Sequence, residues 1–327
     1  MTARARMLAI VALVAAAAAS ATVGVTLLQT HGERTSANAA VGKPKPGSPP
    51  LELQFGLRDD AEARALARAA TLYNEGKHAR AATIFGRYHS LEARIGAAFA
   101  HWPGHGLDEL KRLVASHPKS SLAELHLGLA YYWSGLNGDA EKAFKRAETL
   151  QPDTPYALSA ASILNPSMPQ LPLPIFVAQS PPPPGIAKLP ARKQVPALAR
   201  LARGHDVAAR LYYGIALQNL GRAVSAERAF ASAAKLAPND PEALAAAAVG
   251  RFRKDHPERA FSRLGPLAKR FPHAAVVRFH LGYLLIWLGD YTQARKELTL
   301  AISDAPQSVY AKDARVLLAK LPNNGTK

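Results

Sequence analysis

The pattern of hydrophobic and polar positions divides the chain into an apolar N-terminal stretch, a polar connection and a long helical body. Residues 7–28 carry no charge, whereas residues 29–56 hold few large apolar side chains and many Pro and Gly. From residue 57 to residue 321, apolar side chains recur at helical spacing in segments separated by short polar, Gly or Pro breaks. We therefore predict a short N-terminus over residues 1–6, an apolar helix, a flexible linker, a helical body, and a tail over residues 322–327.

Residues 7–28 are long enough to cross about 30 Å of hydrocarbon as a helix that rises roughly 1.5 Å per residue. Arg4 and Arg6 precede this stretch and no comparable basic cluster follows it directly, which favours an inside N-terminus and an outside body. Ala19, Ser20 and Ala21 also form a small-x-small site that is typical of a cleaved signal peptide. We predict a single-pass anchor in the cytoplasmic membrane with an extracytoplasmic body, or secretion after cleavage.

The linker over residues 29–56 contains the run from Lys43 to Gly47 and the pair Pro49-Pro50. A chain of this composition buries little apolar surface and stays extended. We expect it to act as a stalk that holds the body clear of the bilayer.

The helical body repeats with a period of 34 residues, because segments that begin at Val207, Pro241 and Ala275 follow one another at that spacing. In a pair of antiparallel helices, small residues allow close crossing, a glycine makes the turn and a proline ends the second helix. The segments from Ser121, Val207 and Ala275 carry these features at matching positions. Those positions are Leu127, Gly128, Tyr131, Gly135, Ala140, Phe144, Ala147 and Pro152; Tyr213, Gly214, Leu217, Gly221, Ala226, Phe230, Ala233 and Pro238; and Leu281, Gly282, Leu285, Gly289, Tyr291, Ala294, Leu298, Ala301 and Pro306.

This pattern resembles the tetratricopeptide-repeat (TPR) family, and the resemblance covers residues 62 to about 321. It implies an all-α fold, an α-solenoid of about seven antiparallel helix pairs with residues 309–321 as a capping helix. The segments near Glu62 and from Pro241 match less well, and residues 91–118 resemble a shortened pair.

The segments from Ser121 and Val207 lie about 18 residues further apart than two periods require, so one repeat is predicted to be split. We expect its first helix over residues 156–164 and its second to begin near Pro196, in the first helical position. The insertion falls within residues 166–190, where closely spaced prolines favour polyproline II.

Two positions for this insertion remain open. It contains Leu171, Leu173, Ile175, Phe176 and Val177, which are unfavourable in water, and proline-rich chains bind well to Tyr and Trp surfaces. One hypothesis therefore places the insertion across the concave groove of its own solenoid. The alternative is a disordered loop, or one packed on the outer face.

In TPR proteins the first helix of each unit lines the concave face, so the resemblance implies a groove for a protein or peptide ligand. We predict that Leu125, Leu129, Tyr132, Trp133, Leu211, Ile215, Gln218, Phe279, Tyr283 and Trp287 form this partner-binding groove. Aromatic side chains give large contact area for a small entropy loss. The same residues can equally be core. His126 and His280 occupy equivalent positions in two repeats and are expected to be packed or groove-lining.

Candidate chemistry adds little to this picture. The sequence shows no supported nucleophile with a base, phosphate loop or metal cluster, so we predict a non-enzyme with no catalytic, cofactor or metal residues. His101 and His105 are separated by Pro103-Gly104, which breaks the helix that would align two metal ligands. The absence of cysteine excludes disulfides and thiolate metal sites.

Charge leaves a second function open. The net charge is +17, with Lys and Arg scattered among Asp and Glu. The leading prediction is an extracytoplasmic, membrane-anchored scaffold for protein–protein interaction in cell-envelope assembly. The alternative is an exported binder of an anionic envelope polymer or nucleic acid, nucleic acid being the less favoured ligand. The oligomeric state is not predicted.

Overall fold

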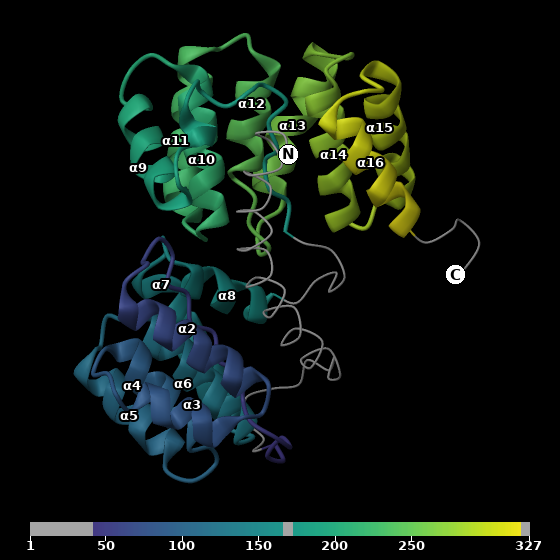
Figure 1. Ribbon diagram of the computed structural model, residues 1–327. Helices are drawn as coiled ribbons and strands as arrows, with labels where there is room; N and C mark the ends of the chain where they lie inside the picture. The colour runs from purple at the N-terminus through teal and green to yellow at the C-terminus, as the bar shows by residue number, and fades with distance from the viewer. Residues whose placement is uncertain (1–41, 166–172, 322–327) are drawn as a thin grey trace. The chain divides into compact units, whose positions relative to one another are not determined.

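The computed structural model describes residues 42–165 and 173–321. Within these ranges the chain forms fifteen α-helices and one short 3-10 helix, and no strand (Figure 1). The predicted all-α fold of antiparallel helix pairs is confirmed. The predicted membrane helix over residues 7–28 and the tail lie outside the described residues. No helix within the described ranges is both long enough and apolar enough to cross a bilayer.

The described residues divide into two compact units, which we call the N-terminal unit (residues 42–165) and the C-terminal unit (residues 173–321). The N-terminal unit begins with extended chain and continues with seven helices. These are α2 (Ala61–Asn74), α3 (His78–Phe85), α4 (Leu91–Ala100), α5 (Gly106–Ser116), α6 (Ser121–Trp133), α7 (Asn137–Leu150) and α8 (Pro155–Leu164).

The C-terminal unit repeats this plan, with extended chain followed by helices. Its elements are η1 (Ile186–Lys188), α9 (Ala191–Leu201), α10 (Val207–Asn219), α11 (Ala223–Leu236), α12 (Pro241–Val249), α13 (Glu258–Arg270), α14 (Ala275–Trp287), α15 (Tyr291–Asp304) and α16 (Val309–Lys320). The three segments that begin at Val207, Pro241 and Ala275 each form a helix pair, α10 to α15, and the capping helix expected over residues 309–321 is α16.

Local sequence explains where the first helix of each pair begins. Side chains such as those of Ser120 and Asp206 accept a hydrogen bond from the backbone N–H three residues later. This bond satisfies a donor that the first helical turn leaves free. Within each pair, small residues set the crossing distance. A Cβ on Gly128 would lie 2.6 Å from the Phe144 ring, and one on Gly214 would likewise overlap the Phe230 ring.

The predicted split repeat differs from the structure. The expected first helix agrees with α8, but α8 belongs to the N-terminal unit and α9 to the C-terminal unit. Pro196 lies inside α9, which starts five residues earlier at Ala191, so its predicted first-turn position is wrong. Pro190 caps α9 instead. The described residues therefore form two units, each with its own extended segment.

The flexible stalk predicted for residues 29–56 is wrong for its described part, residues 42–56. Leu51 is 3% exposed, and Leu53 and Phe55 pack against the core of the N-terminal unit. These three apolar side chains, spaced two residues apart, bury one face of an extended chain. The first helix begins only at Ala61.

Candidate functional site

An extended segment of the N-terminal unit lies along the surface that α2, α6 and α8 form. We call residues 42–57 the first strap. Its backbone N–H groups at Gly42 and Lys45 donate to the carbonyl oxygens of Gly135 and Trp133, each at 2.8 Å. Gly135 has a φ of 78° and no side chain, so the strap backbone can approach it closely.

Side chains of α2, α6 and α8 hold the rest of the first strap. The hydroxyl of Tyr73 donates to the carbonyl oxygen of Pro49 at 2.6 Å. The Glu52 N–H donates to Nε2 of His126 at 3.2 Å. The hydroxyl of Tyr156 both accepts from the N–H of Gln54 and donates to its carbonyl oxygen, at 3.1 Å each. Side chains from three helices thus satisfy the backbone of the first strap. We call the surface that these helices form the first groove, and the equivalent surface of the C-terminal unit the second groove.

A second extended segment lies in the same way in the C-terminal unit. We call residues 173–185 the second strap; Figure 1 shows it as a teal thread beside α12 and α14. Phe176 is 1% exposed, and its ring stacks on the His280 ring at 5.1 Å between centroids. Its N–H donates to the side-chain oxygen of Gln218 at 3.1 Å, and the Val177 N–H donates to Nε2 of His280 at 3.1 Å. The docked position considered for the proline-rich insertion is therefore confirmed for these residues.

Glu242 at the start of α12 collects four donors at the other end of the second strap. Its carboxylate accepts from the N–H groups of Gln179 and Ser180, from the Ser180 hydroxyl, and from the Tyr310 hydroxyl. Hydrogen bonds to an ionised acceptor are roughly twice as strong as neutral ones. The Tyr212 hydroxyl donates to the Ser180 carbonyl at 2.7 Å, so the backbone is held from both sides.

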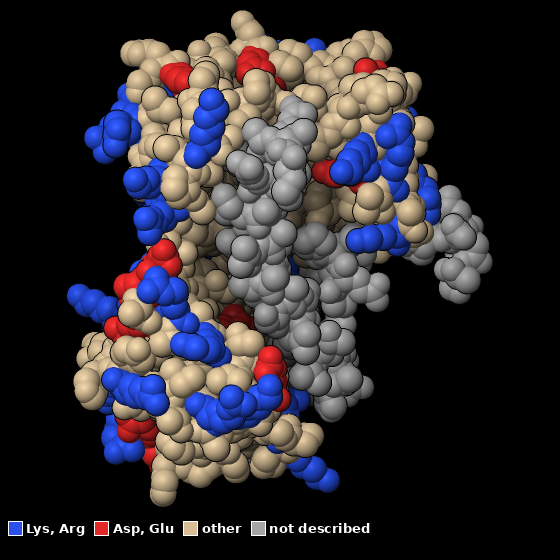
Figure 2. Space-filling model, viewed as in Figure 1, with Lys and Arg blue, Asp and Glu red and all other residues tan. Residues whose placement is uncertain are grey.

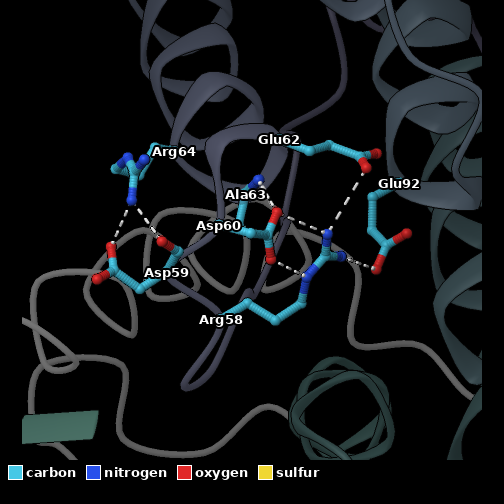
Figure 3. A network of polar contacts seen from close by, with 7 residues as sticks. All are labelled: Arg58, Asp59, Asp60, Glu62, Ala63, Arg64 and Glu92. Atoms are coloured by element: carbon cyan, nitrogen blue, oxygen red, sulfur yellow. Dashed lines mark hydrogen bonds and ion pairs between the residues drawn. The ribbon is translucent and has the colours of Figure 1, made fainter.

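The corresponding carboxylate in the N-terminal unit, Glu92 of α4, reaches its strap through an arginine. Figure 3 shows Arg58, the residue after the first strap, pointing towards Asp60, Glu62 and Glu92. The guanidinium lies 3.6 Å from the Glu92 carboxylate. This network fixes the end of the strap where it enters α2.

His126 and His280 hold the two straps by the same geometry. Each Nδ1 lies within hydrogen-bond distance of the carbonyl oxygen four residues earlier, that of Leu122 at 2.8 Å or Val276 at 2.7 Å. Because a carbonyl only accepts and a backbone N–H only donates, the proton sits on Nδ1 and Nε2 is the acceptor. Burial lowers the pKa of both imidazoles to about 4, against the effect of these backbone bonds. Both histidines are therefore neutral at pH 7.

The ten residues predicted for the groove divide into strap contacts and core. Gln218 bonds the second strap, and Ile215 packs against the same apolar cluster as Ala178 of that strap. The centroid of the Tyr132 ring lies 4.2 Å from Lys45 Nζ. Tyr283 and Pro174 border the same narrow space beside His280. The others are buried: Leu125, Leu129, Trp133, Leu211, Phe279 and Trp287. Four of the ten residues thus lie at or near a strap and six are core, and partner binding by this set stays a prediction.

The sequence prediction missed five residues that carry the strap contacts: Tyr73, Tyr156, Tyr212, Glu242 and Tyr310. One signal could have found two of them. Tyr156 and Tyr310 are separated by the same 154 residues as His126 and His280. Within the described part of the chain, no three His, Cys, Asp or Glu side chains are grouped so that they could hold a metal ion.

The surface charge differs between the units. Figure 2 shows Lys and Arg spread over the visible face of both units, with Asp and Glu between them. Residues 173–321 hold 22 Lys and Arg against 10 Asp and Glu, whereas residues 42–165 hold 15 against 13. The excess of basic charge thus belongs mainly to the C-terminal unit.

One protein-family model matches part of the chain. Residues 252–321 match the tetratricopeptide-repeat model. The matched segment contains α13 to α16, including His280 and Tyr310 of the second groove. No curated protein matches the sequence.

Several solved structures are similar to this chain at low overall similarity. The Cut9–Hcn1 hetero-tetramer of APC/C matches with 17% identity and a TM-score of 0.33, over 78% of this chain and 48% of that chain. The TPR2AB domain of yeast Sti1 in complex with a pHSP90 matches with 12% identity and a TM-score of 0.30, over 79% and 97%. The pilus biogenesis factor PilW matches with 14% identity and a TM-score of 0.31, over 79% and 100%. This chain spans about half of the first of these chains, and likenesses at this level carry no functional argument.

Proposed function

We propose that this protein is a non-catalytic scaffold that binds extended peptide segments of partner proteins in two grooves, one in each unit. One observation carries the proposal: both grooves already hold an extended polypeptide through side-chain bonds to its backbone. Backbone recognition of this kind gives affinity for any extended chain, and pockets for alternate side chains add specificity.

The proposal includes export and membrane anchoring, with the body outside the cytoplasmic membrane and a role in cell-envelope assembly. It is supported by the uncharged stretch over residues 7–28 and by Arg4 and Arg6 before it. An anchored chain with two peptide grooves would hold two partners, or two segments of one partner, beside the membrane.

Crosslinked affinity purification with groove variants tests this function. The full chain is crosslinked mildly in membranes and purified, and its bound proteins are compared between wild type and a Tyr132→Ala, Gln218→Ala double variant. Both side chains face a strap, so we expect a specific set of proteins to be lost. Val316→Ala is the matched control, because Val316 is an exposed apolar residue on α16 and should leave that set unchanged. Recovery of the same set with the double variant would reject the grooves as the binding site.

A second candidate function rests on the basic excess of the C-terminal unit. Lys and Arg spread over this unit would attract an anionic envelope polymer without a specific groove, by counterion release. Binding of a soluble polyanion would then fall steeply between low and high salt. It would also be insensitive to Gln218→Ala, which separates this candidate from the peptide groove.

A further inference from the structure

The two straps share a short sequence pattern. Both contain a proline, a large apolar residue two positions later and a glutamine three positions after that. In the first strap these residues are Pro49, Leu51 and Gln54, and in the second strap they are Pro174, Phe176 and Gln179.

The apolar and glutamine positions meet equivalent contacts in both units. The apolar residue is buried in the groove, and the N–H of the residue after it donates to the groove histidine. The glutamine N–H donates to a side chain, the Tyr156 hydroxyl in one unit and the Glu242 carboxylate in the other. The equivalent tyrosine, Tyr310, donates to that same carboxylate. Equivalent positions of the pattern therefore contact equivalent groove residues in the two units, so both straps bind in the same register.

The spacing along the chain does not explain this register. The two copies of the strap pattern are 125 residues apart, whereas the groove histidines and tyrosines are 154 residues apart. The connection between strap and groove therefore differs by 29 residues between the units. If the length of the connecting chain fixed where a strap binds, the two straps would contact different groove residues. The contacts between strap and groove therefore set the register.

We propose that each groove recognises, in a partner protein, an extended peptide of the form Pro-x-(Leu or Phe)-x-x-Gln, and that the resident strap is an exchangeable copy of that ligand. This inference rests on the proposed function and adds the ligand class and a form of self-occupancy. A strap leaves its groove without breaking a helix or a sheet. The second strap is held by side chains, and the first strap adds two backbone bonds, to the carbonyl oxygens of Trp133 and Gly135 at the end of α6. A short tether gives the strap an effective concentration on the order of millimolar, so a partner has to compete with it.

Peptide binding to strap variants of the full chain tests the proposal. The probe is a fluorescent peptide with the sequence of residues 173–185, followed by fluorescence anisotropy. The variants are Phe176→Ala, which removes the buried anchor of the resident strap, and Gln179→Ala, which removes its contact with the Val309 N–H. Both changes lie in the strap, so the groove that receives the probe stays intact. We expect saturable binding that is at least about tenfold tighter in both variants than in wild type.

Controls separate recognition from general stickiness. A probe with the Phe replaced by Ala and a scrambled probe should each bind at least tenfold more weakly, and His280→Ala in the Phe176→Ala background should reduce binding of the intact probe. Val316→Ala should behave as wild type. Circular dichroism checks that each variant is folded. If Phe176→Ala is not folded, Gln179→Ala takes its place in the binding test.

Two results would overturn the inference in different ways. Equal binding of the intact and scrambled probes would reject the sequence pattern while leaving a peptide-binding groove. Absence of binding by folded strap variants to any probe would show that the straps are fixed parts of the fold, and would reject the proposed function as well.

Discussion

At the scale of single residues, close helix crossing and groove chemistry depend on a few side chains. Gly128 and Gly214 lie directly under phenylalanine rings of the neighbouring helix, so no side chain fits between the two helices. The groove histidines are neutral because burial disfavours the imidazolium. Each of these features gives a prediction.

Replacing Gly128 or Gly214 with Leu should lower the free energy of unfolding by about 2 to 4 kcal/mol, because the helices have to move apart. Denaturant unfolding measures this loss. Gly265 in α13 is the matched control, since a Cβ there meets no atom within 4 Å. Gly265→Ala should be neutral or stabilising by up to about 1 kcal/mol. A Gly128→Leu protein as stable as wild type would reject the helix pairing.

Histidine titration by NMR should show a His280 pKa of about 4 in wild type and a value nearer 6.5 in Phe176→Ala, because the strap covers the ring. A pKa that is lowered in the docked state makes docking strongest above pH 6.5 and weakens it as pH falls towards 4, by at most about 3 kcal/mol. Glu242, Tyr310 and Tyr283 also face this region. The same pKa in both proteins would mean that the helices alone bury the ring.

The first strap should respond less simply to pH. Burial raises the pKa of Glu52, with a partly opposing hydrogen bond from Ser159, so protonation of Glu52 favours docking. His126 acts in the opposite direction, as His280 does. The two effects on docking of the first strap have opposite signs in acid, so the C-terminal unit is the simpler system for the titration.

At the scale of elements, the straps are the parts that composition alone misjudges. The helices follow from the 34-residue period, the small residues at crossings and the Gly and Pro breaks, so the sequence places most of them well. Proline and glycine near residues 43–50 suggest disorder, because composition does not show that His126 and Tyr156 lie where they satisfy this backbone. Pro196 suggests a helix start, but the chain accommodates it inside α9. The repeat pattern also does not show the division into two units, because repeat segments occur on both sides of it.

Replacing residues 171–184 with a Gly/Ser linker of equal length should leave the helix content unchanged and raise the affinity of the C-terminal groove for its peptide ligand. The reason is that a flexible linker without an apolar anchor does not compete for the groove. Circular dichroism measures the first quantity and fluorescence anisotropy the second. An unchanged affinity would contradict self-occupancy.

At the scale of the whole molecule, the chain consists of two strap-and-groove units behind a predicted membrane anchor. An apolar helix that spans a bilayer resists conditions that remove electrostatically bound proteins. Detergent should therefore release the protein from membranes, whereas high salt and carbonate should not. A soluble protein that begins near Thr22 would instead show signal cleavage.

The most direct test of the central claim, that each groove holds a strap of its own chain, is hydrogen exchange on the full-length protein resolved to single amides. The account predicts protection at Glu52, Gln54, Phe176, Val177 and Gln179, whose N–H groups donate to groove side chains. It also predicts that His280→Ala lowers protection in the second strap while α10 and α11 keep theirs. Exchange of these strap amides at the rates of an unstructured peptide in the wild-type protein would contradict the account.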